Sequence, residues 1–74
     1  MMSGITYTYG CLERPPGPGS VPREGLIRCT DTECFDAAGW RCWGWVEYDR
    51  PLKAFEQAHY ALSLIRMNGV GTAR

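Results

Sequence analysis

Residues 39–57 read GWRCWGWVEYDRPLKAFEQ, and this stretch holds all three tryptophans of a 74-residue chain before it turns abruptly polar. Residues 40–48 are rich in aromatic residues and follow a turn signal, which predicts a strand. Its side chains would divide between two faces, with Cys42, Gly44, Val46 and Tyr48 on one and Arg41, Trp43, Trp45 and Glu47 on the other.

Two further strands are expected upstream. Residues 26–35, LIRCTDTECF, read as a strand, and DAAG at residues 36–39 supplies a turn that ends in Gly39. The short connection makes residues 26–35 and 40–48 an antiparallel hairpin. Residues 4–12, GITYTYGCL, alternate strictly and place Tyr7 and Tyr9 on one face of a first strand.

A proline-rich loop separates the first strand from the hairpin. Residues 13–25, ERPPGPGSVPREG, contain four prolines, which fix φ and remove backbone donors, so neither a helix nor a central strand runs through them. We expect this loop to cover Trp43 and Trp45 on the open face of the sheet. The two indoles would then form a second small core, with their edges left available to a partner.

The C-terminal part predicts a helix over residues 51–67. Asp49 is a suitable N-cap, Pro51 is favoured in a first turn, and Asn68-Gly69 is a stop signal, which leaves residues 68–74 as a tail. An apolar stripe at helical spacing would face the sheet: Ala54, Phe55, Ala58, Ala61, Leu62 and Ile65. The expected fold class is therefore α+β: a single small domain with a three-stranded antiparallel sheet and one C-terminal helix packed across it (β-β-β-α).

Composition narrows the classes of function. Eight basic and eight acidic side chains give a formal net charge of zero, which argues against avid sequence-independent binding to DNA. No run reaches the roughly 18 apolar residues of a membrane span, and the start MMSGITYTYG lacks the features of a signal peptide. We therefore expect a soluble protein made in the cytoplasm, with no membrane partner.

The four cysteines leave three readings open. Successive cysteines are separated by seventeen, four and seven residues. Only the four-residue separation of Cys29 and Cys34 fits the paired-cysteine spacing of a zinc knuckle. Reduced, largely buried thiols are the favoured reading, ahead of a cross-strand disulfide and of a zinc site that would use Cys11, Cys29, Cys34 and Cys42. We expect no cofactor.

Catalysis is not indicated. The single histidine, His59, has no cysteine directed at it by the sequence pattern, and phosphate-loop, dinucleotide and metal-hydrolase motifs do not occur. The sequence therefore predicts a non-catalytic protein.

Three surfaces are candidates for binding. The first combines the proline loop with the tryptophans and would contact a protein partner: Pro16, Pro18, Val21, Trp43 and Trp45. The second is a helical row suited to self-association as a homodimer: Tyr60, Leu64 and Met67. The alternative is a face that stacks single-stranded nucleic acid, in which Tyr7, Tyr9, Arg28 and Arg41 join the two tryptophans.

Two segments carry a resemblance. TYTYGCLERPPGPGSVPREGL near the start and GWVEYDRPL before the helix share a pattern: a tyrosine-rich strand, an RPPGPGxVPxxGL loop and a GWxEYDR strand before a short acidic helix. By this pattern the chain resembles small uncharacterised proteins of actinobacterial bacteriophages and prophages. The match spans Tyr7 to Leu26 and Gly44 to Leu52, whereas the helix departs from the acidic pattern. The resemblance implies a phage or prophage accessory protein that acts inside the host, and it implies no particular activity. With it, the expected location becomes the host cytoplasm and the expected partner a host or phage protein.

Overall fold

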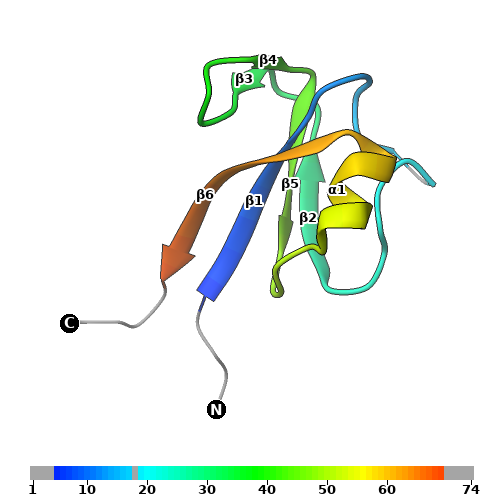
Figure 1. The fold of residues 1–74 in the computed structure, drawn as a ribbon, viewed down its shortest axis with the longest axis vertical. Helices are drawn as coiled ribbons and strands as arrows, with labels where there is room; N and C mark the ends of the chain where they lie inside the picture. Colours follow the sequence, from blue (N-terminus) through cyan, green and yellow to red (C-terminus); the bar gives the residue numbers. More distant parts are fainter. Residues whose placement is uncertain (1–4, 18, 70–74) are drawn as a thin grey trace.

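The computed structural model describes residues 5–17 and 19–69. Within them the chain forms six strands and one short helix (Figure 1). In chain order these are β1 (Ile5–Cys11), β2 (Leu26–Thr30), β3 (Cys34–Phe35), β4 (Arg41–Cys42), β5 (Gly44–Tyr48), α1 (Ala54–Tyr60) and β6 (Leu62–Gly69).

The expected three-stranded sheet with a C-terminal helix is wrong. The described residues build a four-stranded antiparallel sheet in the order β2-β5-β1-β6, together with a separate two-stranded ladder of β3 and β4. Residues 26–35 and 40–48 do pair with each other, but as two ladders, with β2 against β5 and β3 against β4. The small ladder projects from one end of the sheet, away from the end where Ile5 of β1 pairs with Gly69 of β6 (Figure 1).

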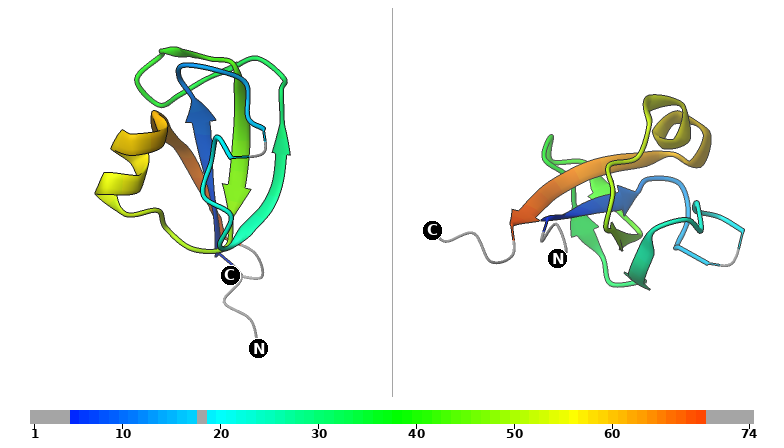
Figure 2. Two further views of the ribbon diagram at one scale, coloured as in Figure 1. Left: turned by 90° about the vertical axis from the view of Figure 1, so that its right-hand side faces the viewer. Right: turned by 90° about the horizontal axis from the view of Figure 1, so that it is seen from below.

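The helix expected over residues 51–67 is restricted to Ala54–Tyr60, and the chain then returns as β6. Ala61 adopts a left-handed conformation, with φ of 54°, and ends the helix. A seven-residue helix with no buried residue gains little from packing, whereas residues 62–69 gain a ladder of backbone hydrogen bonds along the edge of β1, interrupted by one register shift. Residues 62–69 therefore form strand β6 and do not continue the helix. As a result, α1 lies beside the sheet and not across it (Figure 2).

The main core lies on one face of the sheet. Tyr9, Val46 and Tyr48 point to this face from β1 and β5, and the rings of Tyr9 and Tyr48 meet edge to face with centroids 6.1 Å apart. The residues that complete this cluster are Cys11, Val21, Leu52 and Leu62. Val21 belongs to the proline-rich segment, so this loop covers the tyrosine and valine face and not the tryptophan face.

The opposite face is partly covered by the β3–β4 ladder. A Cβ atom at Gly10 would collide with the Sγ atom of Cys42, which shows how closely β4 approaches β1. Cys42 is completely buried, and the Cδ1 atom of Ile65 lies 3.3 Å from the same Cβ position. Glycine at position 10 is therefore required by this close approach. No helix in the described residues is long and apolar enough to cross a membrane.

Candidate functional site

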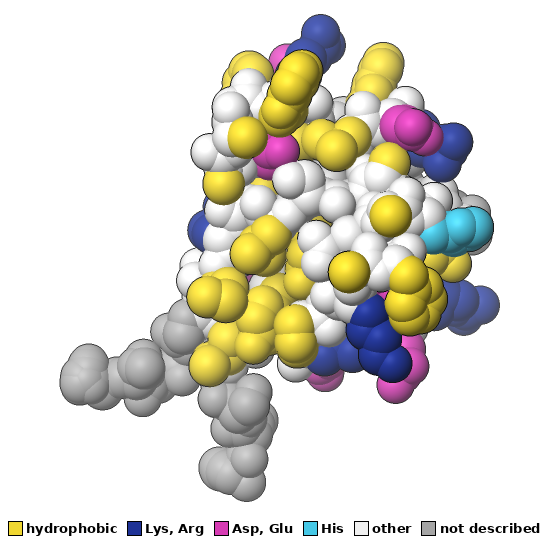
Figure 3. Space-filling view, viewed as in Figure 1, with side chains coloured by type: hydrophobic (Ala, Val, Ile, Leu, Met, Phe, Trp, Pro, Cys, Tyr) yellow, Lys and Arg dark blue, Asp and Glu magenta, His cyan; other side chains and the backbone are white. Residues whose placement is uncertain are grey.

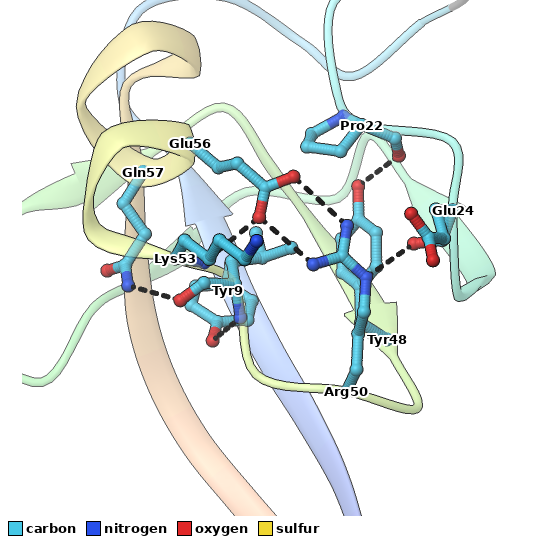
Figure 4. A network of polar contacts seen from close by, with 9 residues as sticks. Tyr9, Pro22, Glu24, Tyr48, Arg50, Lys53, Glu56 and Gln57 are labelled. Atoms are coloured by element: carbon cyan, nitrogen blue, oxygen red, sulfur yellow. Dashed lines mark hydrogen bonds and ion pairs between the residues drawn. The ribbon is translucent and has the colours of Figure 1, made fainter.

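Two regions of the molecule concentrate its specific contacts, and the first joins the proline-rich loop to the end of β5. The Tyr48 hydroxyl is buried and donates to the carbonyl oxygen of Pro22 at 2.5 Å, while burial raises the pKa of Tyr48 above its ordinary range. The backbone N–H of Asp49 donates to the carbonyl of Gly25 at 3.0 Å. These two bonds hold the loop against the strand, and Figure 4 shows the one between Tyr48 and Pro22.

Arg50 extends this first region. Its Nε atom donates to the carbonyl of Glu24 at 3.0 Å, and its two terminal nitrogens donate to the carboxylate of Glu56 at 3.0 and 3.1 Å (Figure 4). Glu56 also accepts the backbone N–H of Lys53 at 2.9 Å. The bonds from Arg50 and then from Lys53 lower the pKa of Glu56 to about 2. We call Pro22, Gly25, Tyr48, Arg50 and Glu56 the motif junction.

The motif junction joins the two segments that carry the resemblance. The loop pattern supplies Pro22 and Gly25, and the GWxEYDR pattern supplies Tyr48 and Arg50. A Cβ at Gly25, where φ is 80°, would lie 2.7 Å from Oδ1 of Asp49. The side chains of this region therefore serve to hold the fold, since their polar atoms bind each other.

The second region is the β3–β4 ladder with its turn, residues 34–43, which we call the aromatic hairpin. Asp36 organises the turn, because its Oδ1 atom accepts the backbone N–H groups of Ala38 at 3.0 Å and Trp40 at 2.8 Å. Its Oδ2 atom accepts the hydroxyl of Ser63 on β6 at 2.8 Å. The bond from the Trp40 N–H contributes most to lowering the pKa of Asp36. The turn is thus fixed internally and tied to the main sheet.

This fixed hairpin exposes three aromatic side chains. Phe35 is 58% exposed, Trp40 69% and Trp43 51%. The guanidinium of Arg41 lies 5.8 Å from the centre of the Trp43 ring and pairs with Glu33 at 2.7 Å. Figure 3 shows hydrophobic side chains projecting from the upper end of the molecule, where Figure 1 places β3 and β4. Such side chains are an exception to the burial that aromatic residues usually prefer.

The surface expected from the proline loop and the tryptophans is divided between two faces. Val21 is buried in the main core and Pro16 is half-buried, with its Cδ atom 2.7 Å from the position of a Cβ at Gly44. Trp45 is half-buried opposite Gly10, on the other face of the sheet, and Trp43 is exposed. Pro18 lies outside the described residues. The loop therefore does not cover the indoles.

The helical row expected for self-association does not exist as a row. Tyr60 ends α1 and packs against the main core, whereas Leu64 and Met67 lie on β6, opposite Tyr9 and Tyr7 of β1. Met67 is 62% exposed. The spacing that suggested a row assumed that the helix continued to residue 67.

The residues of the alternative nucleic-acid face are also separated. Tyr9 is buried and its hydroxyl accepts the backbone N–H of Leu52 at 2.8 Å, while Tyr7 packs against the same core. Arg28 pairs with Glu47 at 3.0 Å on the opposite face of the sheet. No single face brings the tyrosines and tryptophans together among the described residues.

All four cysteines are free thiols. Cys11 and Cys42 are buried, Cys34 is half-buried and Cys29 is exposed on β2. Burial, followed by the neighbouring cysteines, raises the pKa of Cys11 to about 12, and burial raises that of Cys42 to about 11. Within residues 5–17 and 19–69, no three or more His, Cys, Asp or Glu side chains are grouped so that they could hold a metal ion.

A surface pocket of about 350 Å³ opens between the proline-rich loop and β2. Its lining includes one cation, Arg23, and one thiol, Cys29, beside the aliphatic side chains of Val21 and Leu26. A pocket of this composition suits an apolar side chain better than a charged group.

Sequence reasoning missed Phe35 and Trp40 as candidate site residues. Both flank the DAAG turn, and a turn residue such as Trp40 has little opportunity to reach a core. The position of Phe35 and Trp40 directly beside the turn at residues 36–39 was the sequence signal from which their exposure could have been predicted.

Comparison with known families gives a match over most of the chain. Residues 5–67 match the model of the family described as Defence against restriction A C-terminal. The match covers all of β1 to α1 and most of β6, and so includes both the motif junction and the aromatic hairpin. Comparisons with curated proteins and with solved structures found no significant match.

Proposed function

Since the chain belongs to the family Defence against restriction A C-terminal, we propose that it is a non-catalytic phage accessory protein that helps to counter host restriction. It acts as a protein–protein interaction module, and its partner is a host or phage protein. The aromatic hairpin is the binding surface in this proposal.

The exposure of Phe35, Trp40 and Trp43 on one short hairpin is the observation that carries the proposal. Tryptophan and arginine are the residues most enriched among those that dominate binding energy at protein interfaces. The bonds from Asp36 to Ala38, Trp40 and Ser63 hold the turn in one arrangement before a partner arrives. Preorganisation of this kind lowers the entropy lost on binding.

The charges around the hairpin favour a protein partner over a nucleic acid. Arg41 is already paired with Glu33, and Arg28 with Glu47, so neither cation is fully available to a phosphate. The formal net charge of the chain is zero, which provides little counterion release. An apolar pocket on a protein is the partner surface that these aromatic side chains suit.

The shifted pKa values support a non-catalytic role. The bonds to Trp40 and Arg50, respectively, lower the pKa values of Asp36 and Glu56, and both carboxylates are held in structural contacts. Burial raises the pKa values of Cys11 and Cys42, whereas a cysteine that acts as a catalytic nucleophile at neutral pH usually has a lowered pKa.

Affinity capture with matched variants tests the proposal. Tagged wild-type protein, the Trp40→Ala/Trp43→Ala double variant and Phe55→Ala are expressed in a restricting host during phage infection, and captured proteins are quantified. Phe55 is the matched control because it is 68% exposed on α1, against 69% for Trp40. A specific partner should be retained by Phe55→Ala and reduced more than about tenfold in the double variant. Equal capture by all three proteins would refute the hairpin as the binding surface.

A plating assay tests the biological role with the same variants. Unmodified phage is plated on a restricting host that expresses each protein, and the plaques are counted. Wild type and Phe55→Ala should raise the plating efficiency, and the double variant should not. No protection by folded wild-type protein would contradict the role in restriction while leaving the capture result to be judged separately.

A further inference from the structure

Cys34 and Cys42 lie directly opposite each other in the β3–β4 ladder. Opposed residues of an antiparallel pair have Cα atoms about 4.5–5.5 Å apart. This separation lies inside the range of about 4.4–6.8 Å that a disulfide requires. Because side chains alternate along a strand, both thiols extend from the same face of the ladder, opposite to Phe35 and Arg41.

The two thiols also interact in the reduced protein. They lie within hydrogen-bonding reach of each other. The Sγ atom of Cys34 further donates to the carbonyl of Gly44 at 3.7 Å, and that of Cys42 to the carbonyl of Trp40 at 3.6 Å. Neither sulfur needs a change in backbone pairing to approach the other.

From this geometry we propose that Cys34 and Cys42 form a reversible disulfide that closes the base of the aromatic hairpin. The bridge would enclose residues 35–41, including Phe35 and Trp40, within a covalent loop. The inference concerns a redox modification site and holds whether or not the hairpin binds a protein partner.

The different exposures of the two thiols set the order of the reaction with a low-molecular-weight disulfide such as oxidised glutathione. Cys34 is half-buried and accessible, whereas Cys42 is fully buried. The Cys34 thiolate attacks one glutathione sulfur, and the first glutathione leaves as a thiolate. The Cys42 thiolate then attacks the Cys34 sulfur and releases the second glutathione. The two protons lost by the cysteines are taken up by the two leaving thiolates, so two protein thiols are oxidised and one glutathione disulfide is reduced.

The acidities of the thiols agree with this order. Burial raises the pKa of Cys34, but the hydrogen bond from Cys42 opposes that effect. Burial raises the pKa of Cys42 to about 11, so this thiol is a poor first nucleophile. The reaction should therefore be slow at neutral pH and faster as the pH rises.

Peptide mapping of the full-length protein tests the inference. Folded wild-type protein is incubated with oxidised glutathione, the remaining thiols are alkylated, and the peptides are analysed by mass spectrometry with and without reduction. The expected product is an intramolecular bridge between Cys34 and Cys42, with Cys11 and Cys29 alkylated. Dithiothreitol should restore all four thiols.

Two variants make the result decisive. Cys29→Ser removes the exposed thiol on β2 and should leave the bridge intact, whereas Cys34→Ser should abolish it. A circular dichroism spectrum equal to wild type establishes that each variant is folded. Mixed disulfides or dimers through Cys29 alone, or a bridge from Cys11 to Cys42, would overturn the inference.

Discussion

The motif junction and the aromatic hairpin are both held by short hydrogen bonds, but they use their side chains in opposite ways. At the junction, the ring of Tyr48 is fully buried and its hydroxyl binds Pro22. At the hairpin, Asp36 binds the backbone, and the indole of Trp40 points to solvent with 69% of the residue exposed. In the first region the aromatic side chain packs in the core and stabilises the fold, whereas in the second the aromatic side chains are exposed and can contact another molecule.

This difference teaches how to interpret a sequence motif. The quoted patterns that carry the resemblance, RPPGPGxVPxxGL and GWxEYDR, meet at the junction, where Arg50 bridges Glu24 and Glu56. In this chain, the residues of these two patterns that meet at the junction therefore hold the fold together. The proposed binding surface lies between the two patterns, in residues 34–43. Substitutions in the two regions should consequently separate folding from binding.

Replacing Tyr48 with alanine should have the largest effect on stability. Loss of a fully buried aromatic side chain costs about 3–5 kcal/mol, which is comparable to the total stability of a domain this small. Tyr48→Phe keeps the packing but leaves the Pro22 carbonyl without its donor, and should cost about 1–3 kcal/mol. Urea unfolding followed by circular dichroism measures both. A free energy of unfolding unchanged in Tyr48→Phe would show that the Pro22 bond contributes nothing.

Two glycines with similar backbone geometry compare the regions directly. Gly25 at the junction has φ of 80° and Gly39 in the hairpin turn has φ of 90°. Placing alanine in this left-handed backbone conformation should therefore destabilise the protein by a similar amount, about 1–2 kcal/mol, at either position. A Cβ at Gly25 would meet Asp49 and Arg50, whereas nothing lies within 4 Å of one at Gly39. Gly25→Ala should therefore be more destabilising than Gly39→Ala. Equal thermal midpoints would show that the junction relaxes freely.

Acid should weaken the motif junction as Glu56 becomes protonated. The Arg50 bonds lower the pKa of Glu56 from 4.5 to about 2, so its contribution is complete above pH 4.5 and disappears as the pH falls toward 2. Glu56→Gln should be less stable than wild type at pH 7 and should lose less stability on acidification. Unfolding curves recorded between pH 7 and pH 2 should converge at the acid end. Parallel pH profiles would contradict the role of the carboxylate.

Truncating the exposed tryptophans should affect stability least. Surface substitutions away from specific contacts usually change the free energy of unfolding by less than about 0.5 kcal/mol. Trp40→Ala and Trp43→Ala should each stay near that limit, because the turn is held by Asp36 and by the bond from the Trp43 N–H to the Cys11 carbonyl at 2.8 Å. A loss of several kcal/mol in urea unfolding would mean that the indoles are structural.

Local patterns predicted part of the fold. Alternation placed a strand at residues 4–12, and β1 occupies residues 5–11. The DAAG signal placed a turn at residues 36–39, where Asp36 now binds the turn backbone. These features depend on neighbouring residues alone, so a single sequence is enough to recognise them.

Residues 62–67 show why the rest of the fold was missed. Leu62 and Ile65 fit a helical stripe, and Ala61 carries no glycine-like signal that a left-handed turn ends the helix there. The decisive factor is the open edge of β1, which accepts β6 over eight residues. That gain is tertiary, so helical periodicity could not reveal it.

The candidate site was missed for a related reason. Which sheet face the proline-rich loop covers depends on Val21 entering the core and on the bond between Tyr48 and Pro22, two contacts between distant segments. The pattern identified Trp43 and Trp45 as sharing a face, but it did not indicate that the loop would cover the other one.

Hydroxyl-radical footprinting of the complex with a captured partner tests the central claim most directly. Labelling of Trp40, Trp43 and Phe55 is compared in the free and bound protein, so that the exposed Phe55 on α1 serves as an internal reference. Strong protection of both tryptophans with unchanged labelling of Phe55 is the result that this account predicts. Protection of Phe55 or Met67, with both tryptophans still labelled as in the free protein, would contradict it.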